Sequence, residues 1–299
     1  MKIDNNCCNI CSFNEFELIK DKLRDDRVKY KVYKCKECSH VQLVPKPTAQ
    51  EDKEFYDKNL QDKSRGKDID YNKLVANNFF DTTRHVELIK QLCPDANCKI
   101  LDIGTGYGFF VTELHNQGYK NILGIEPSIQ RREIACKYSP AMVIDFDLDN
   151  PSKDIGKFNV ITLFHVLEHM AEPIMFLRTI KKFMNPNGVF ICEVPNENEL
   201  LLDTCKSYND FYWIRAHLNY FNEKTLLACF KKAEYDNVQI KYQQRYGLLN
   251  LCNWLIVGKP QIDCPVFEVD GEYKKTENFY KQQVESEGKS DALIAIARV

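Results

Sequence analysis

Short apolar segments alternate with amphipathic stretches between residues 97 and 243 of this 299-residue chain. Five of these segments predict buried strands, several of which stop at a glycine or a proline: 99–102, 122–126, 142–145, 159–164 and 188–194. The stretches between them predict helices at 107–117, 128–138 and 173–184. Buried strands that alternate with helices are typical of a parallel sheet covered on both faces. Two further apolar segments, 238–243 and 292–299, would bring the sheet to seven strands.

The composition excludes several classes of protein. Lys and Arg number 41 and Asp and Glu 43, which gives a net charge of −2 and argues against a strongly basic nucleic-acid binder and an acidic disordered chain. The chain contains no run of about 18 apolar residues, so we expect no membrane span. The first residues lack the apolar region of a secretory signal, and we therefore expect a cytoplasmic protein.

Two pairs of cysteines near the start of the chain have the spacing of metal ligands. Cys8 and Cys11 form one C-x-x-C pair, Cys35 and Cys38 form the other, and 23 residues separate the pairs. Four thiolates complete a tetrahedral shell around Zn²⁺ and leave no open position for water, so we expect a structural zinc ion. His40 is an alternative ligand.

The chain is expected to divide into three parts. Residues 1–45 would form the zinc-binding module, and residues 46–92 would form a helical linker or lid. Residues 93–299 would form the main domain, in which 244–290 reads as an irregular insertion that shapes the substrate site before the last strand.

A glycine-rich loop follows the first predicted strand of the main domain and opens a helix. Its pattern, D-x-G-x-G-x-G, consists of Asp102, Gly104, Gly106 and Gly108. Such a loop lets the backbone approach a ligand closely, and the helix start offers free N–H groups. Glu126 ends the next strand, where a carboxylate could bind ribose hydroxyls. A dinucleotide loop needs a third glycine at a position occupied here by Phe109 or Val111, which argues against an NAD-dependent oxidoreductase.

This loop, Glu126 and the segment from Phe158 to His169 resemble class I S-adenosylmethionine-dependent methyltransferases. The resemblance implies a Rossmann-like, seven-stranded, mostly parallel sheet with helices on both faces, plus the small zinc-binding module. It also implies cofactor contacts by the loop residues and Glu126, and by four residues at the ends of the third and fourth strands: Asp145, Phe146, Phe164 and His165. Asp147 is an alternative to Asp145 as the partner of adenine.

The pattern H-x-x-E-H contains His165, Glu168 and His169. At helical spacing these side chains share a face, so one interpretation is a general base that takes a proton from a hydroxyl acceptor. His217, in a segment that recurs in one branch of the resembling family, is the other candidate base, with Glu168 as the orienting carboxylate. Some relatives bind magnesium through a similar motif, so a divalent metal site is a second interpretation; ordinary packing is a third.

The N-terminal cysteine segment resembles that of methyltransferases that act on nucleotide-linked sugars. It implies a sugar-type small-molecule acceptor, as in the synthesis of a surface glycan. The candidate substrate residues are Tyr56, Tyr212, Arg215 and Tyr220, because aromatic rings stack on sugars and arginine pairs with phosphate. The alternatives are an RNA or protein methyltransferase that uses the zinc module for recognition, and a non-catalytic zinc-binding protein. The sequence leaves the oligomeric state open, a homodimer included.

Overall fold

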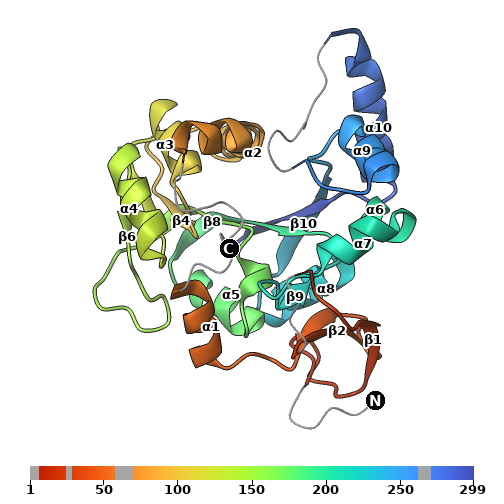
Figure 1. Cartoon of the computed structure of the whole chain (residues 1–299). Helices are drawn as coiled ribbons and strands as arrows, with labels where there is room; N and C mark the ends of the chain where they lie inside the picture. Colours follow the sequence, from red (N-terminus) through yellow and green to blue (C-terminus); the bar gives the residue numbers. More distant parts are fainter. Residues whose placement is uncertain (1–6, 25–28, 58–69, 262–270) are drawn as a thin grey trace.

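The computed structural model describes residues 7–24, 29–57, 70–261 and 271–299. A seven-stranded sheet crosses the middle of the molecule, and a smaller sheet lies beside it near the N-terminus (Figure 1). Among the described residues, none of the helices combines the length and the apolar composition needed to span a bilayer.

The large sheet has the strand order β10-β11-β8-β7-β4-β5-β6. Its strands are β4 (Ile100–Ile103), β5 (Ile122–Ile125), β6 (Met142–Ile144), β7 (Phe158–Phe164), β8 (Met184–Pro195), β10 (Asn237–Gln243) and β11 (Ala292–Arg298). The strands pair in parallel, except that β11 runs antiparallel to both of its neighbours. This arrangement confirms the predicted mostly parallel, seven-stranded sheet, with strand ends shifted by a few residues.

Helices cover both faces of this sheet. On one face lie α2 (Tyr71–Leu92), α3 (Phe109–Asn116) and α4 (Ile129–Tyr138). On the other lie α5 (Pro173–Lys181) and α8 (Glu223–Lys232). The strands are buried from both sides because alternate residues point to each layer: Ile100 packs toward α2 and α3, whereas Leu101 packs toward α5 and α8. The predicted helices are confirmed with slightly shorter bounds.

The carboxyl ends of β4, β5, β7, β8 and β10 meet at one edge of the large sheet, here called the carboxyl edge. Connections that leave this edge include η2 (Leu167–His169), α6 (Leu200–Thr204) and α7 (Lys206–Tyr212). Open α/β sheets bind their ligands at this edge, so these connections are where the site is expected.

The prediction of irregular structure at 244–290 is wrong over most of its described part. Residues Leu248–Val257 form α9, Gly271–Tyr273 form η3 and Lys274–Ser286 form α10; residues 262–270 lie outside the described residues. Helix α9 ends at Gly258, whose φ of 67° lies in the left-handed region. Both helices stand together beyond β10, opposite α2 (Figure 1).

The small sheet consists of β1 (Phe16–Lys20), β2 (Lys31–Cys35), β3 (Val41–Val44) and β9 (Asn219–Tyr220), all antiparallel. We call it the four-cysteine sheet. Its fourth strand comes from the main domain of the chain and was not predicted. Buried residues of its N-terminal segment, among them Ile10 and Phe16, belong to the same core as Leu101 and Phe190 of the large sheet. Helix α1 (Ala49–Asp57) follows this sheet and, with α2, confirms the predicted helices within 46–92.

Candidate active site

The glycine loop after β4 has the backbone that its sequence predicts. Gly104, Gly106 and Gly108 have φ values of +80°, +61° and +84°, which side chains other than glycine rarely adopt. A Cβ atom on Gly104 would lie 2.4 Å from Cγ2 of Val166, so the loop and the end of β7 touch without room for a side chain. The open surface of the loop is therefore backbone, as a close approach to a ligand requires.

Glu126 lies at the end of β5 and is 4% exposed. Its Oε2 atom accepts from the N–H of Gly106 at 2.8 Å, and Oε1 accepts from the N–H of Ser128 at 2.9 Å. These two bonds fix the carboxylate beside the glycine loop. Each oxygen keeps a second lone pair, so the group fits the predicted contact with two ribose hydroxyls.

Asp102 is buried on β4, two residues before the first glycine of the loop. Thr162 on β7 donates its hydroxyl to Oδ1 of Asp102 at 2.7 Å. Burial raises the pKa of Asp102 to about 6, so part of the population is protonated near neutral pH. Asp102 thus holds the start of the loop against β7.

The residues predicted to contact adenine lie in different surroundings. Asp147 accepts from the N–H groups of Asp149 and Asn150 and caps a turn, whereas Asp145 is exposed with Arg132 at 3.5 Å. Asp145 is thus the freer of the two carboxylates. The prediction for Phe146 is wrong, because its ring is 7% exposed and packs edge-on against Phe183 in the core.

The motif H-x-x-E-H begins where β7 ends. His165 has a φ of 55°, and its Nε2 atom lies 3.0 Å from Oε1 of Glu193. Its Nδ1 atom lies 3.4 Å from Oε1 of Glu168. Burial disfavours the charged ring, but the two carboxylates outweigh it and raise the pKa of His165 to about 9. His165 therefore carries a proton at neutral pH.

His169 and His217 join Glu168 from the other side. Glu168, His169 and His217 each bring one oxygen or nitrogen atom to within 4.8 Å of the others, a separation that a shared cation would suit. The ring centroids of the two histidines are 5.1 Å apart. Glu168 is 2% exposed, and neither of its carboxylate oxygens has a hydrogen-bond partner. We call His165, Glu168, His169 and His217 the histidine–glutamate cluster.

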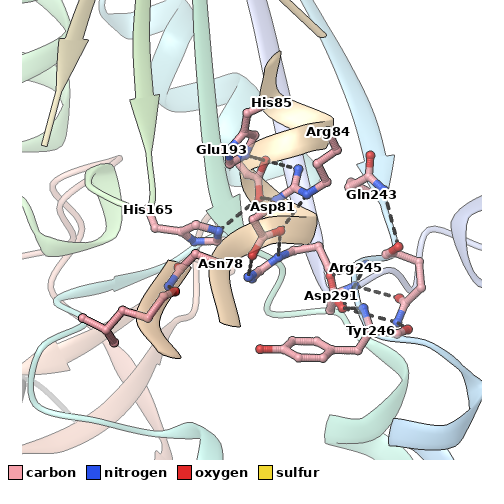
Figure 2. Close-up of polar contacts among 12 residues, drawn as sticks. Asn78, Asp81, Arg84, His85, His165, Glu193, Gln243, Arg245, Tyr246 and Asp291 are labelled. Carbon is pink, nitrogen blue, oxygen red and sulfur yellow. Dashed lines mark hydrogen bonds and ion pairs between the residues drawn. The ribbon is translucent and has the colours of Figure 1, made fainter. Parts of the chain in front are cut away.

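A buried ionic network supports this cluster from the side of α2 (Figure 2). Arg84 donates from both terminal nitrogens to Glu193, at 2.6 and 2.5 Å, and His85 lies 2.9 Å from the same carboxylate. Asp81 accepts from Arg84 at 2.7 Å and also pairs with Arg245, which follows β10. Sequence reasoning missed these residues, since no motif links α2 with β8 or β10. The pair of Asp81 and Arg84, three residues apart on α2, was the one available signal.

Glu193 is the centre of that network. It is fully buried, and although burial alone would raise its pKa, Arg84 and the two histidines hold the pKa well below its usual range. Phe164, a predicted cofactor residue, is half-buried and stacks on His85 with ring centroids 3.7 Å apart. The network thus fixes α2, His165 and Phe164 in one arrangement at the carboxyl edge.

Two predicted substrate residues serve the protein's own packing. Tyr220 is 2% exposed, and its hydroxyl both donates to the carbonyl and accepts from the N–H of Ile214, so its predicted substrate contact is wrong. Arg215 is 3% exposed, pairs with Asp52 at 2.5 Å and lies over the rings of Tyr30 and Phe55. It therefore fastens α1 to the four-cysteine sheet rather than facing an open site.

The structure describes the side chain of only one of the other two predicted substrate residues, Tyr212 and Tyr56. Tyr212 is half-buried and donates its hydroxyl to the carbonyl of Asn196 at 3.3 Å. The side chain of Tyr56 lies outside the described residues.

The four predicted cysteines converge. Sγ of Cys8 lies 3.5 Å from Sγ of Cys38, and Sγ of Cys11 lies 3.5 Å from Sγ of Cys35. All four sulfur atoms lie within 4.8 Å of one another. The hydrogen bond from Cys8 lowers the pKa of Cys38 to about 5, which favours the thiolate form that binds a metal ion. His40 is turned away, with Nε2 3.1 Å from Oδ1 of Asn219.

A family model described as a methyltransferase domain matches residues 59–240. The chain belongs to this methyltransferase family. This membership, with the glycine loop and the sheet, supports an S-adenosylmethionine-dependent methyltransferase and argues against the oxidoreductase and non-catalytic alternatives.

Individual methyltransferases resemble the chain more distantly. It is 27% identical over 108 residues to a ubiquinone biosynthesis O-methyltransferase of Actinobacillus pleuropneumoniae, a match over 33% of this chain and 46% of that enzyme. The chain therefore spans about half the length of the curated relatives it matches.

Solved structures share the fold of this methyltransferase. A possible histamine N-methyltransferase of Thermotoga maritima is 15% identical with a TM-score of 0.53, covering 82% of this chain and 98% of that one. A methyltransferase of Archaeoglobus fulgidus is 17% identical with a TM-score of 0.51, covering 77% of this chain and 100% of that one.

Proposed function

We propose that this methyltransferase transfers a methyl group to a hydroxyl oxygen of a small molecule, with His217 accepting the hydroxyl proton. The observation that carries the proposal is the buried carboxylate of Glu168, whose two oxygens have no hydrogen-bond partner although three histidines surround it. The ion pairs with His165 and His169 offset the charge of Glu168, but its oxygens lack direct hydrogen bonds, which is costly in a protein interior. Such a group is expected where a bound substrate or a transferred proton supplies the missing contact.

The charges of the cluster suit proton transfer. The pKa of Glu168 stays below its usual value despite burial, because the protonated ring of His165 lies against it. The pKa of His217 is lowered to about 3 by burial and by the neighbouring His169, so its ring is neutral. Its Nδ1 atom is buried without a partner. A neutral imidazole has the nitrogen lone pair that a proton acceptor needs, and the carboxylate of Glu168 acts in favour of its charged form.

The cofactor would lie along the carboxyl edge. S-adenosylmethionine supplies, when bound, a methyl group on a positively charged sulfur that leaves as a neutral thioether in an in-line displacement. The glycine loop and Asp102 would bind its methionine end, Glu126 its ribose hydroxyls and Asp145 its adenine. Phe164 and His165 would approach the methionine part. The protein then contributes orientation, exclusion of water and the proton acceptor.

Two classes of acceptor have separate support. The paired C-x-x-C segment resembles that of sugar methyltransferases, which favours a sugar-type hydroxyl, as in glycan synthesis. The matched relatives are named for ubiquinone biosynthesis, which favours an acceptor of the ubiquinone-precursor class. The sugar-type acceptor is the one we propose, with Tyr212 as a contact. The ubiquinone-type acceptor is the second candidate, and a role in RNA or protein methylation has no supporting observation in the site.

Methyl transfer from isotopically labelled S-adenosylmethionine tests the proposal. The acceptors are a set of nucleotide-linked sugars and a set of polyhydroxylated aromatic compounds. With whichever set is labelled, His217→Gln should lower kcat by at least roughly 100-fold, the usual scale for a lost general base. Affinity for S-adenosylmethionine, measured by calorimetry, should stay within about twofold. His115→Gln, at the far end of α3, is the matched control. Full activity of the His217 variant would contradict the proposal.

We also propose that the four cysteines bind one structural zinc ion. Four converging sulfur atoms leave no ligand position for water, and a cation would replace the protons that the thiols now share. Elemental analysis should find about one zinc per chain in the wild type and none in Cys35→Ser. Cys136→Ser, an exposed cysteine on α4, should keep the metal. Equal metal content in the two variants would refute the assignment.

A further inference from the structure

Asn219 is a buried residue whose hydrogen bonds connect the segments of the four cysteines with the histidine–glutamate cluster. We call it the junction. It is fully buried, and its Oδ1 atom accepts from Nδ2 of Asn9 at 2.8 Å. Its Nδ2 atom donates to the carbonyl of Met170 at 2.7 Å. Since Nδ2 must face that carbonyl, Oδ1 is also the acceptor for Nε2 of His40, 3.1 Å away. One side chain therefore joins three segments of the chain.

The partners of Asn219 lie next to the four cysteines on one side and next to the histidine–glutamate cluster on the other. Asn9 lies between Cys8 and Cys11, and His40 follows Cys38 by two residues. On the other side, Met170 directly follows His169, and Asn219 itself follows His217 by two residues. A side chain that fixes Asn9 relative to Met170 therefore also fixes the cysteine ligands relative to the two histidines.

The backbone makes the same connection. Leu218 donates its N–H to the carbonyl of Glu168 at 2.8 Å, and its own carbonyl accepts from the N–H of Leu43 in β3 at 3.0 Å. The next residue, Asn219, pairs with Gln42 as the start of the edge strand β9. In addition, Nδ1 of His169 lies 2.7 Å from the carbonyl of Ala216. Residues 216–219 are thus bonded to the cluster and to the four-cysteine sheet at once.

We propose that Asn219 is a positioning residue, and that the four-cysteine sheet acts as the scaffold that holds His217 in place for methyl transfer. The proposal rests on the proposed role of His217 and, for the effect of metal, on the proposed zinc site. A strand of two residues has little stability of its own, so its place depends on the sheet it joins. Loss of the metal or of the amide would let His217 move while leaving the cofactor side, built on β4 and β5, unchanged.

The test compares Asn219→Ala with Asn9→Ala, which removes only one of the three bonds, and with Asn237→Ala, an exposed asparagine at the start of β10, as the control. The readouts are the ¹³Cε1 resonance of His217, assigned with His217→Gln, and calorimetric titration of S-adenosylmethionine. In Asn219→Ala we expect the resonance to shift toward that of an unstructured histidine, with a smaller shift in Asn9→Ala and none in the control. Affinity for the cofactor should change less than twofold, which also shows that the variant is folded.

Removal of zinc from the wild-type protein by a chelator provides the second arm. We expect the same shift of the His217 resonance, together with faster hydrogen exchange of the peptide that spans 214–221. With an acceptor identified, Asn219→Ala should lower kcat at least tenfold and leave KM for S-adenosylmethionine unchanged.

An unmoved His217 resonance in Asn219→Ala would overturn the positioning role, and Asn9→Ala decides the question if Asn219→Ala does not fold. A shift in Asn219→Ala without one on metal removal would overturn the scaffold role of the metal. Absence of zinc from the purified protein would instead refute the zinc site. The asparagine variants would then still test whether Asn219 positions His217.

Discussion

The Nε2 atom of His165 and the Oε1 atom of Glu193 lie 3.0 Å apart at the carboxyl ends of two neighbouring parallel strands. Glu193 is also bound by Arg84 and His85, so one buried carboxylate sets the orientation of helix α2 and of the first histidine in the cluster. The charge state of His165 therefore affects the stability of the fold as well as the site.

The stability of the protein should fall at alkaline pH through His165. Its pKa is raised from 6.5 to about 9, so its contribution is fully present below about pH 6.5 and is lost as the pH rises through 9. The loss should be on the order of 3 kcal/mol. Urea denaturation at pH 6 and 9.5 measures it, with His165→Gln as the comparison. If wild type and variant lose equal stability between these values, His165 is not the group responsible.

Arg84→Ala should destabilise the protein by roughly 3–5 kcal/mol, because it leaves the buried charge of Glu193 without its main partner. His85, which also lies on α2, makes a single hydrogen bond to Glu193 and cannot replace the two charged N–H donors of Arg84. Thermal or chemical denaturation gives the value. Lys90→Ala removes a surface pair on the same helix and should cost no more than about 0.5 kcal/mol. Similar effects of the two substitutions would contradict the central role given to Glu193.

Glu126→Ala should weaken binding of S-adenosylmethionine by about 2–3 kcal/mol, the scale of hydrogen bonds to a charged group. The expected change is roughly 30- to 150-fold in Kd. Part of it comes from the N–H groups of Gly106 and Ser128, which lose their acceptor. Calorimetric titration measures the change, and Glu133→Ala, an exposed position on α4, serves as the control. Unaltered affinity in the Glu126 variant would remove its ribose-binding role.

Gly104→Ala should be more damaging than Gly156→Ala. Both glycines have φ near +80°, so each substitution carries about 1–2 kcal/mol of backbone strain. Only at Gly104 would the new Cβ also meet Val166, at 2.4 Å, whereas Gly156 has open space. Overpacking should add about 1–3 kcal/mol. The difference in free energy of unfolding between the two variants isolates this contact, and a difference near zero would show that Val166 moves aside freely.

Sequence patterns predicted the large sheet well because its strands contain continuous apolar runs such as Val189–Cys192, which few other structures can bury. They failed for β9, since two residues carry no periodic signal. Helix α10 was missed because most of its residues are polar. The four cysteines of the proposed zinc site could be predicted because each C-x-x-C pair is a short, local pattern.

Long-range contacts explain most errors in the site. Phe146 and Tyr220 look alike in sequence whether they face a ligand or the core, and only the packing around Phe183 and Ile214 decides. The pair between Arg84 and Glu193 joins residues 109 positions apart, without any motif that connects them. The sequence indicated His217 as a candidate base through the segment around it. Its link to the four-cysteine sheet depends on β9, which has no signal in the sequence.

The late origin of β9 has a consequence for synthesis of the chain. Strands β1 to β3 leave the ribosome long before residues 219–220 are made, a delay of roughly 10 to 40 seconds at ordinary elongation rates. During that time the nascent sheet has β3 as a free edge, since the backbone partner of Gln42 does not yet exist. The four-cysteine sheet therefore cannot reach its final form until residues 219–220 have emerged. Its open edge is closed by the same segment that carries His217.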